Sequence, residues 1–206
     1  MPDERMTEVR TDRARVAVLI SGAGSNMAAL IDAGGQADAP FEVVLVLSNK
    51  AEAGGLAVAE AKGVPTAVID HAPFGKDRAA HEFAVHRVLN THRVEVVALA
   101  GYMRLLTPFL VGRWAGRMLN IHPSLLPKYP GLNTHARALA AGDAEAGCTV
   151  HLVTEGVDEG PVLGQAAVPV QPEDTPASLA QRVLAAEHRL YPQALADFCR
   201  RQIGSS

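Results

Sequence analysis

Short apolar runs alternate with segments of helical periodicity along the first 121 residues. Each run is continuously apolar, which is typical of a strand buried within a parallel sheet. Five such strands are predicted, at residues 16–20, 43–47, 66–69, 94–100 and 118–121. Three helices are predicted between them, at residues 26–31, 56–62 and 78–91, the last with apolar positions at Phe83, Val85, Val88 and Leu89. This alternation indicates βαβ units, whose ligands bind at the carboxyl ends of the strands.

The pattern changes after residue 121. Residues 122–147 are rich in proline and glycine, with one helix predicted near residues 134–141. Two further strands are predicted to pair as an antiparallel extension, at residues 149–153 and 162–169. A long helix is predicted over residues 176–200, and we expect Pro192 to kink or break it because proline lacks the backbone N–H. The chain is thus predicted to be α/β, with a mostly parallel twisted sheet of about seven strands flanked by helices and a Rossmann-like N-terminal half.

Composition narrows the class of protein. No linker separates the halves, so a single domain is predicted over residues 15–206, preceded by a flexible tail at residues 1–14. The formal net charge of −3 lacks the basic excess of a nucleic-acid-binding protein, and no segment is apolar enough to span a membrane. We therefore expect neither nucleic acid nor membrane as a partner. Cys148 and Cys199 are far apart and lack metal-ligand spacing, which favours a reducing cytoplasm.

The first candidate site is Ser-Gly-Ala-Gly-Ser-Asn at residues 21–26, between the first predicted strand and helix. Glycines let the backbone approach an anion, and a helix start offers free N–H groups. Met27 stands where the dinucleotide fingerprint needs its third glycine, and no Gly-Lys-Ser/Thr follows as in a Walker loop. On these residues alone, a phosphate cradle and a turn without a ligand are equally well supported.

The second candidate is Asn-Ile-His-Pro-Ser-Leu-Leu-Pro at residues 120–127, at the carboxyl end of the fifth strand. Residues two apart share a face of a strand, so Asn120 and His122 can point into the same volume. An amide beside an imidazole can stabilise a developing oxyanion and move a proton. A histidine that merely bonds a loop carbonyl is the alternative, and the strand-end position and the stiffening prolines that follow weigh against it.

The third candidate is the acidic loop at residues 155–160, which follows the strand predicted at residues 149–153. Asp158 is a candidate partner for His122, because a nearby carboxylate favours the protonated imidazole. By itself this segment is better explained as an ordinary hairpin turn with solvated acidic side chains.

Together the three segments resemble the glycinamide ribonucleotide formyltransferase family, the folate-dependent transformylases of purine synthesis. The similarity runs from Arg15 to about Ala196. Its most specific motif is NIHPSLLPKYPG at residues 120–131, and LAGYMRLL and AEHRLYP fall where the family has them, at residues 99–106 and 186–192. Asn133 stands where a histidine is common in the family.

The resemblance implies a role for each matched position. The catalytic trio matches Asn120, His122 and Asp158. The nucleotide site matches Gly24, Ser25 and Asn26 at the phosphate and Glu187 at the ribose hydroxyls. The folate pocket matches Met103, Arg104, Leu105, Leu106 and Asn120, with Arg78 near the acidic tail of the folate. The resemblance further implies the formyltransferase fold, glycinamide ribonucleotide and 10-formyltetrahydrofolate as substrates, no metal, a cytoplasmic location and a homodimer.

Four other classes of protein share part of this pattern. The methionyl-tRNA formyltransferases share Asn-x-His but add a nucleic-acid-binding domain and have Arg-Gly where this chain has Pro-Gly-Leu. The hydrolases that release formate from the folate add an N-terminal regulatory domain. A nucleotide-binding module would keep the glycine turn without needing the trio, and a dehydrogenase would need the third glycine.

The other histidines have no metal-ligand spacing such as HExxH. We expect surface or hydrogen-bonded positions for them; they are His71, His81, His86, His92, His135, His151 and His188.

Overall fold

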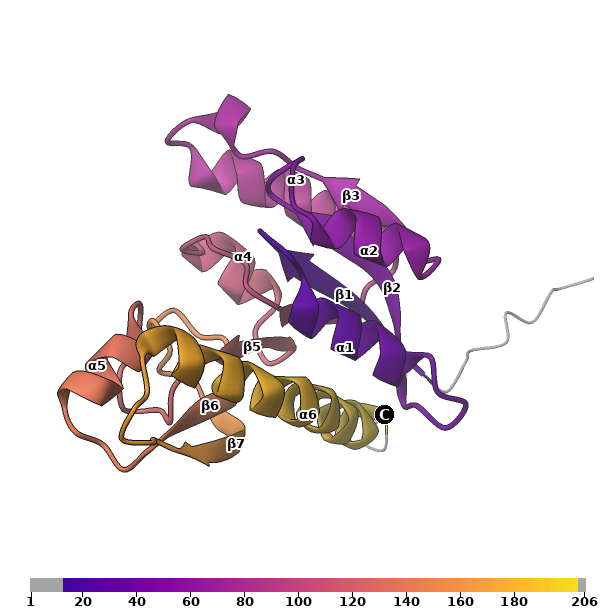
Figure 1. Ribbon diagram of the computed structural model, residues 1–206. Helices are drawn as coiled ribbons and strands as arrows, with labels where there is room; N and C mark the ends of the chain where they lie inside the picture. Colours follow the sequence, from indigo (N-terminus) through magenta and orange to yellow (C-terminus); the bar gives the residue numbers. More distant parts are fainter. Residues whose placement is uncertain (1–12, 204–206) are drawn as a thin grey trace, which may run out of the picture.

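The computed structural model describes residues 13–203 and folds as one α/β domain around a seven-stranded sheet (Figure 1). The strands are β1 (Ala14–Ile20), β2 (Phe41–Ser48), β3 (Thr66–Val68), β4 (Val96–Leu99), β5 (Met118–His122), β6 (Glu145–Leu152) and β7 (Val162–Pro169). The helices are α1 (Ser25–Gly34), α2 (Gly55–Ala61), the 3-10 turn η1 (Ala72–Phe74), α3 (Arg78–Thr91), α4 (Pro108–Arg113), α5 (Thr134–Ala140) and α6 (Pro176–Ile203). Residues 1–12 of the expected tail lie outside the described residues, whereas Ala14 already begins β1.

The sheet has the strand order β3-β2-β1-β4-β5-β6-β7. The first five strands are parallel, and β6 and β7 extend the sheet antiparallel, which confirms the predicted mixture. The chain moves outward from β1 to β3 on one side and from β4 to β7 on the other. The switch point between β1 and β4 is where open α/β sheets bind ligands, at the carboxyl ends of the strands.

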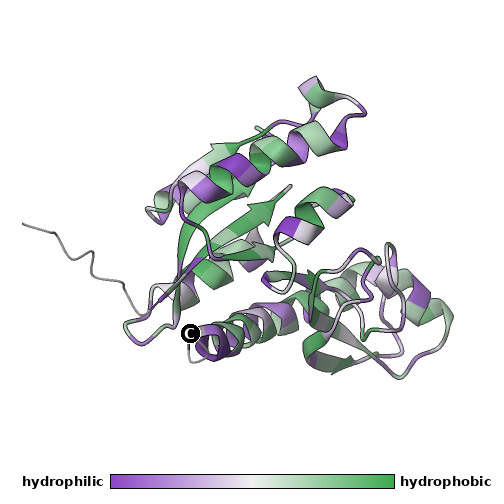
Figure 2. Ribbon diagram, turned by 180° about the vertical axis from the view of Figure 1, so that it is seen from behind, coloured by the Kyte–Doolittle hydropathy of each residue, from purple (hydrophilic) through white to green (hydrophobic). Residues whose placement is uncertain are grey.

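Helices cover both faces of the sheet, which explains why the central strands contain long apolar runs (Figure 2). Val16, Val18 and Ile20 of β1 belong to the core shared with α1, α2 and α6. Ala17 and Leu19 of the same strand belong to the core shared with α3 and α4. Because successive side chains of a strand point to opposite faces, both sets had to be apolar.

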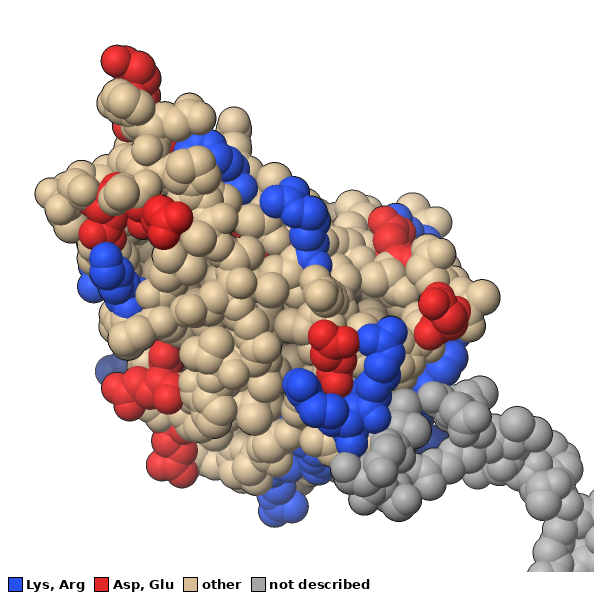
Figure 3. Space-filling model, turned by 90° about the horizontal axis from the view of Figure 1, so that it is seen from below, with Lys and Arg blue, Asp and Glu red and all other residues tan. Residues whose placement is uncertain are grey.

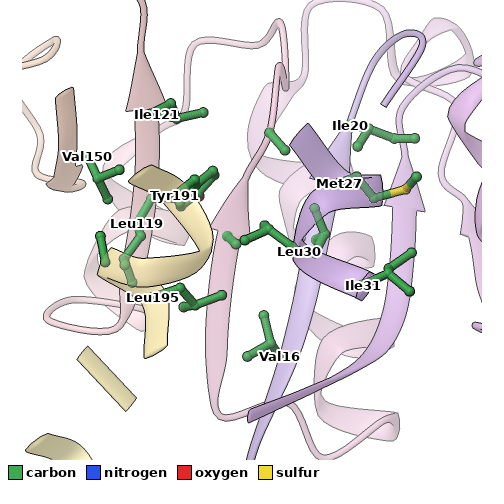
Figure 4. Packing of buried hydrophobic residues seen from close by; sticks show 14 of the residues in the cluster. Val16, Ile20, Met27, Leu30, Ile31, Leu119, Ile121, Val150, Tyr191 and Leu195 are labelled. Carbon is green, nitrogen blue, oxygen red and sulfur yellow. The ribbon is translucent and has the colours of Figure 1, made fainter. Parts of the chain in front are cut away.

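The larger core lies between the sheet and the helices α1 and α6 (Figure 4). Leu30 of α1 and Leu195 of α6 are fully buried there. The Tyr191 hydroxyl of α6 reaches two strand carbonyls, lying 3.0 Å from Leu99 O and 3.2 Å from Leu119 O. Burial raises the pKa of Tyr191 well above its ordinary value, so it stays a neutral donor. The contact fixes α6 against the ends of β4 and β5, where the candidate site begins.

Helix α6 runs without interruption from Pro176 to Ile203, so the expected break at Pro192 is wrong, whereas the alternative, a kink, stays a prediction. A proline inside a helix removes one backbone hydrogen bond and crowds the preceding turn. Tyr191 and Leu195 on either side of it are fully buried against the sheet. Packing of both halves of the helix therefore outweighs the local cost of the proline.

Helix α3 buries only part of the apolar face that its sequence predicts. Val85 and Leu89 are fully buried, but Phe83 is 53% exposed. The first two turns bury His81 and Glu82 in its place. The His81 ring lies 2.8 Å from Ile69 O, and Glu82 accepts the Thr107 N–H at 2.7 Å. This end of α3 thus faces loop backbone, which selects polar side chains.

Charges are mixed on the face of the molecule that Figure 3 shows, which is the underside of the view in Figure 1. Acidic and basic side chains lie among each other there, so this face presents no field of one sign. None of the helices within residues 13–203 is both long and apolar enough to cross a membrane.

Candidate active site

A cavity of about 400 Å³ opens at the carboxyl edge of the sheet, beside the ends of β4 and β5. One wall is the segment 102–107 between β4 and α4, which we call the strap. The opposite wall comes from the turn at residues 131–132 and the loop between β6 and β7. Seven of the residues predicted from the sequence line this cavity: Met103, Arg104, Leu105, Leu106, Asn120, His122 and Asp158.

The predicted catalytic trio converges in this cavity. Asn120 and His122 end β5, and Asp158 lies on the loop after β6 with a left-handed backbone (φ 57°). Asp158 Oδ2 lies 3.2 Å from His122 Nδ1 and accepts the Gly131 N–H at 2.9 Å. The other ring nitrogen of His122, Nε2, is 2.9 Å from Tyr129 O. Both ring nitrogens face oxygen acceptors, an arrangement that a doubly protonated imidazole satisfies.

Asp158 is held as a carboxylate by its surroundings. Burial on its own would raise the pKa of Asp158. Contacts with His151 and the Gly131 N–H, and the charges of His122 and His151, act in the opposite direction and leave the pKa below its ordinary value. The side chains of His122 and Asp158 are only 7% and 11% exposed, so water screens their attraction little. The pair therefore holds the His122 ring in a fixed orientation at the cavity wall.

His151 belongs to the same cluster and was missed from the sequence. It stands on β6 directly opposite Asn120, and its Nε2 is 3.3 Å from Asn120 Nδ2 and 3.5 Å from Asp158 Oδ1. Its Nδ1 lies 2.9 Å from Leu152 O. The neighbouring pair of the same register is His122 with Thr149. Thr149 and His151 have the same two-residue spacing on β6 as Asn120 and His122 on β5. This spacing indicates a shared cluster only once the pairing of the two strands is known.

The glycine turn at residues 21–26 is built from backbone groups. Gly24 caps α1 in a left-handed conformation (φ 74°), and a Cβ there would lie 3.0 Å from the Gly55 Cα. No side chain caps the first turn of α1, so its N–H groups are available to an anion. β1 and β5 are two strands apart, which puts this turn about 10 Å from the trio.

Asn26 and Glu187 meet beside the glycine turn although 161 residues separate them. Asn26 Nδ2 donates to Glu187 Oε2 at 2.6 Å, and both residues are buried. Burial raises the pKa of Glu187, and the bond from Asn26 offsets part of that rise. Asn26 Oδ1 is buried and has no hydrogen-bond partner. A buried acceptor without a partner is costly, so this atom is suited to receive a ligand hydroxyl.

The strap presents both apolar side chains and backbone to the cavity. Met103 and Leu105 are 65% and 66% exposed, unusual values for large apolar residues that face a cleft. Arg78 does not line the cavity; its Nη1 donates to Leu105 O at 3.3 Å from the outer side of the strap. The structure thus brings together the predicted trio and pocket residues and leaves Arg78 at the rim.

The two cysteines add no further reactive centre. Cys148 and Cys199 are buried free thiols, and burial raises the pKa of each to about 12. They are therefore neutral packing groups at physiological pH. Within residues 13–203, no group of three or more His, Cys, Asp or Glu side chains is placed to hold a metal ion.

The chain is similar to known proteins in family profile, in sequence and in structure. The profile of the formyl transferase family matches residues 14–195. The phosphoribosylglycinamide formyltransferase of Haemophilus influenzae is 45% identical over 184 residues, covering 89% of this chain and 86% of that protein. The crystal structure of the protein of that name from Brucella melitensis is 57% identical with a TM-score of 0.87, covering 91% of this chain and 96% of that one.

Longer relatives contain a segment similar to this chain. The trifunctional purine biosynthetic protein adenosine-3 of Bos taurus is 49% identical over 187 residues, covering 91% of this chain. The chain spans only 18% of the length of that protein. The residues matched by the family profile include the trio, the glycine turn and the strap. The chain therefore belongs to the formyl transferase family, and within it to the phosphoribosylglycinamide formyltransferases.

Proposed function

We propose that this chain transfers the formyl group of 10-formyltetrahydrofolate to the amine of N1-(5-phospho-D-ribosyl)glycinamide in purine biosynthesis. The observation that carries the proposal is the convergence of Asn120, His122 and Asp158 in a cavity next to the glycine turn. An acyl transfer needs donors aimed at a developing oxyanion, and it needs two substrates held side by side. The carboxyl edge of the sheet has an amide donor in the cavity and, about 10 Å away, a turn suited to an anion, so it meets both requirements.

The reaction balances without a further reactant. The nucleotide amine attacks the formyl carbon, a new C–N bond forms, and the carbonyl oxygen becomes anionic. When the oxygen re-forms its double bond, the bond to N10 of the folate breaks, and one proton passes in total from the attacking amine to N10. The products are the N-formyl nucleotide and tetrahydrofolate.

The cluster supplies two kinds of stabilisation to that oxygen. Asn120 Nδ2 makes only a long contact of 3.3 Å to His151, which the amide can exchange for a bond to the oxyanion. Both ring nitrogens of His122 already face oxygen atoms, so we infer that it acts on the oxyanion through the charge of its imidazolium and not through a hydrogen bond. Asp158 holds that charge in place and orients the ring.

The nucleotide side is supported by the glycine turn and its neighbours. The start of α1 suits a phosphate, since its first-turn N–H groups have no side-chain cap. Asn26 Oδ1, buried and unpaired, and Glu187 suit the ribose hydroxyls. The span from this turn to the trio suits a ribose and a glycinamide arm.

The folate side is supported by the strap. Met103 and Leu105 offer apolar surface to a flat ring system, and Asn120 closes the inner end of the cavity. Arg78, exposed at the rim, is positioned for the negatively charged tail of the folate rather than for its ring.

A purified-protein assay with both substrates tests this proposal. Tetrahydrofolate should appear in equal amount to the N-formyl nucleotide, and only when both substrates are present. Formate released without the nucleotide would instead favour the hydrolase, and binding of the nucleotide without any turnover would favour a binding module. Transfer to methionyl-tRNA would favour the remaining alternative.

The homodimer and the cytoplasmic location stay predictions. Two buried unpaired thiols are compatible with a reducing compartment. Light scattering during size exclusion would give the mass in solution, and a single-chain mass at micromolar concentration would contradict the homodimer.

A further inference from the structure

The strap carries an anchoring pattern that the proposed reaction does not itself require. Its backbone is held on alternate residues. The Met103 N–H donates to Ser21 Oγ at 2.8 Å, and Leu105 O accepts from Arg78. The Thr107 N–H donates to Glu82 Oε1 at 2.7 Å. These three bonds fix the backbone of the strap to the glycine turn and to α3, while the side chains of residues 103–106 line the cavity.

Glu82 is the most deeply buried of these anchors, at 3% exposure. Each of its two carboxylate oxygens takes one donor of Thr107. Oε1 accepts the backbone N–H, and Oε2 accepts the hydroxyl in a shorter contact. Hydrogen bonds to an ionised acceptor are the stronger kind, and a buried carboxylate needs them to compensate for lost hydration. Thr107 and Glu82 are therefore locked to each other.

Thr107 is also the N-cap of α4, and this changes what the contact does. An N-cap threonine normally caps its own helix, with a glutamate of that helix accepting the N-cap N–H. Here the Thr107 side chain makes no cap bond to α4, and the glutamate comes from α3. The Thr107 side chain thus ties the end of the strap to α3 and not to α4, the helix that follows the strap. Arg78, one helical turn before Glu82, holds Leu105 from the same helix.

We propose that Glu82 is a positioning residue for the reduced folate. It fixes the end of the strap, and with it the backbone and side chains of Met103–Leu106 that line the cavity. Glu82 does not line the cavity and acts through Thr107. The inference rests on the proposed function, because it takes the folate as the occupant of this cavity.

Isothermal titration of the full chain with tetrahydrofolate, and separately with the nucleotide substrate, tests the role of Glu82. Glu82→Ala should weaken tetrahydrofolate binding about ten-fold, the effect expected for lost hydrogen bonds to a charged group. Nucleotide affinity should change less than about two-fold, since Glu82 contacts no part of the glycine turn. Glu82→Gln should recover most of the affinity, because the amide can accept the Thr107 N–H and donate to its hydroxyl.

Two further variants keep the test decisive. Thr107→Val keeps the shape and the N–H but loses the hydroxyl, so it should weaken tetrahydrofolate binding about three-fold even if Glu82→Ala does not fold. Glu60→Ala is the matched control, because it removes another Glu–Thr bond, the 2.9 Å contact to Thr66 on the far edge of the sheet. It should leave both affinities unchanged.

The outcomes separate this inference from the proposed function. Folded Glu82→Ala or Thr107→Val with unchanged tetrahydrofolate affinity overturns the role of Glu82. Equal weakening of both ligands overturns it as well, because that indicates a general loosening. A wild-type chain that does not bind tetrahydrofolate overturns the proposed function, and this inference with it.

Discussion

The glycine turn and the trio cluster lie at the same edge of the sheet but are made of different material. The turn is made of backbone, with the left-handed Gly24 and the free N–H groups of α1. The cluster is made of side chains from β5, β6 and the following loop, which contact one another and of which His122 and His151 are buried. The geometry of the turn depends on the backbone conformations that the chain can adopt. The properties of the cluster depend on which side-chain functional groups lie together.

This difference separates binding from chemistry. A backbone site can hold an anion with little dependence on side-chain identity, so only changes in backbone geometry should harm it. A side-chain cluster loses a charge or a donor with a single substitution and leaves buried partners unpaired. Substitutions in the two regions should therefore affect different kinetic constants.

The largest effect is expected for Asp158→Asn. The variant keeps the size of the side chain but removes the charge opposite His122, so kcat should fall about a thousand-fold. Nucleotide affinity, measured by titration calorimetry, should stay within about three-fold. The control is Asp143→Asn, which removes a carboxylate bonded to Lys128 and Tyr129 outside the cavity. A kcat loss of similar size in that control would remove the special status of Asp158.

Gly24→Ala should come next, with the opposite kinetic signature. The added Cβ meets the Gly55 Cα at 3.0 Å in a left-handed backbone, so nucleotide binding should weaken about ten-fold with kcat nearly kept. Gly142→Ala is matched to it, because Gly142 has a similar φ of 68° but open space around it. Both variants should lose about 1 kcal/mol of stability, whereas nucleotide affinity should fall only in the first. Equal affinities would exclude a phosphate at this turn.

Ser21→Ala sharpens the comparison, because the Ser21 hydroxyl joins the glycine turn of the proposed nucleotide site to the strap of the proposed folate site. It begins the glycine turn, accepts the Met103 N–H of the strap and donates to Asn49 Oδ1 at 2.5 Å. We expect KM to rise about three-fold for both substrates, as for the loss of one or two neutral hydrogen bonds. Ser178→Ala, which removes a hydroxyl bonded to Asp174 at the start of α6, is the control. An effect on one substrate alone would show that the two sides are independent.

The smallest effect concerns the carboxylates of Glu187 and Asp158, whose pKa values move in opposite directions. Burial raises the pKa of Glu187 above its ordinary 4.5, so folding takes up a proton there and stability falls as pH rises through that window. The melting temperature of Glu187→Gln relative to wild type should therefore increase from about pH 4 to about pH 7. The pKa of Asp158 is lowered, so its carboxylate stabilises the fold above pH 3.8, its ordinary pKa. This stabilisation is lost as the pH falls through the lowered pKa. A flat difference across the range would contradict the burial of a charged Glu187.

Much of the fold could be predicted because a parallel sheet covered on both faces leaves continuous apolar runs. The run at residues 16–20 lies within β1, and the expected antiparallel pair is β6 with β7. The short helix α4 was not predicted, although Thr107 before Pro108 is a helix-start signal. The expected burial of Phe83 and the expected helix break at Pro192 failed for one reason, which is that tertiary contacts outweighed the local sequence preference. These contacts are with loop backbone at the start of α3 and with the core along α6.

The candidate site divides in the same way. Asn120 and His122 could be placed together because two-residue spacing on a strand fixes a shared face. Asp158 needed the family resemblance, since its loop alone looks like a solvated turn. His151 and Glu82 could not be identified, because their partners lie across a strand register and on another helix, and neither relation is written in local spacing.

The division between a binding turn and a chemical cluster is tested most directly by single-turnover rates with both substrates saturating. Gly24→Ala should then reach the wild-type rate of formyl transfer, because a weakened site can still be filled. Asp158→Asn should remain slow by about three orders of magnitude however much substrate is added. A Gly24→Ala chain that stays slow at saturation, or an Asp158→Asn chain that saturating substrate restores, would contradict the account.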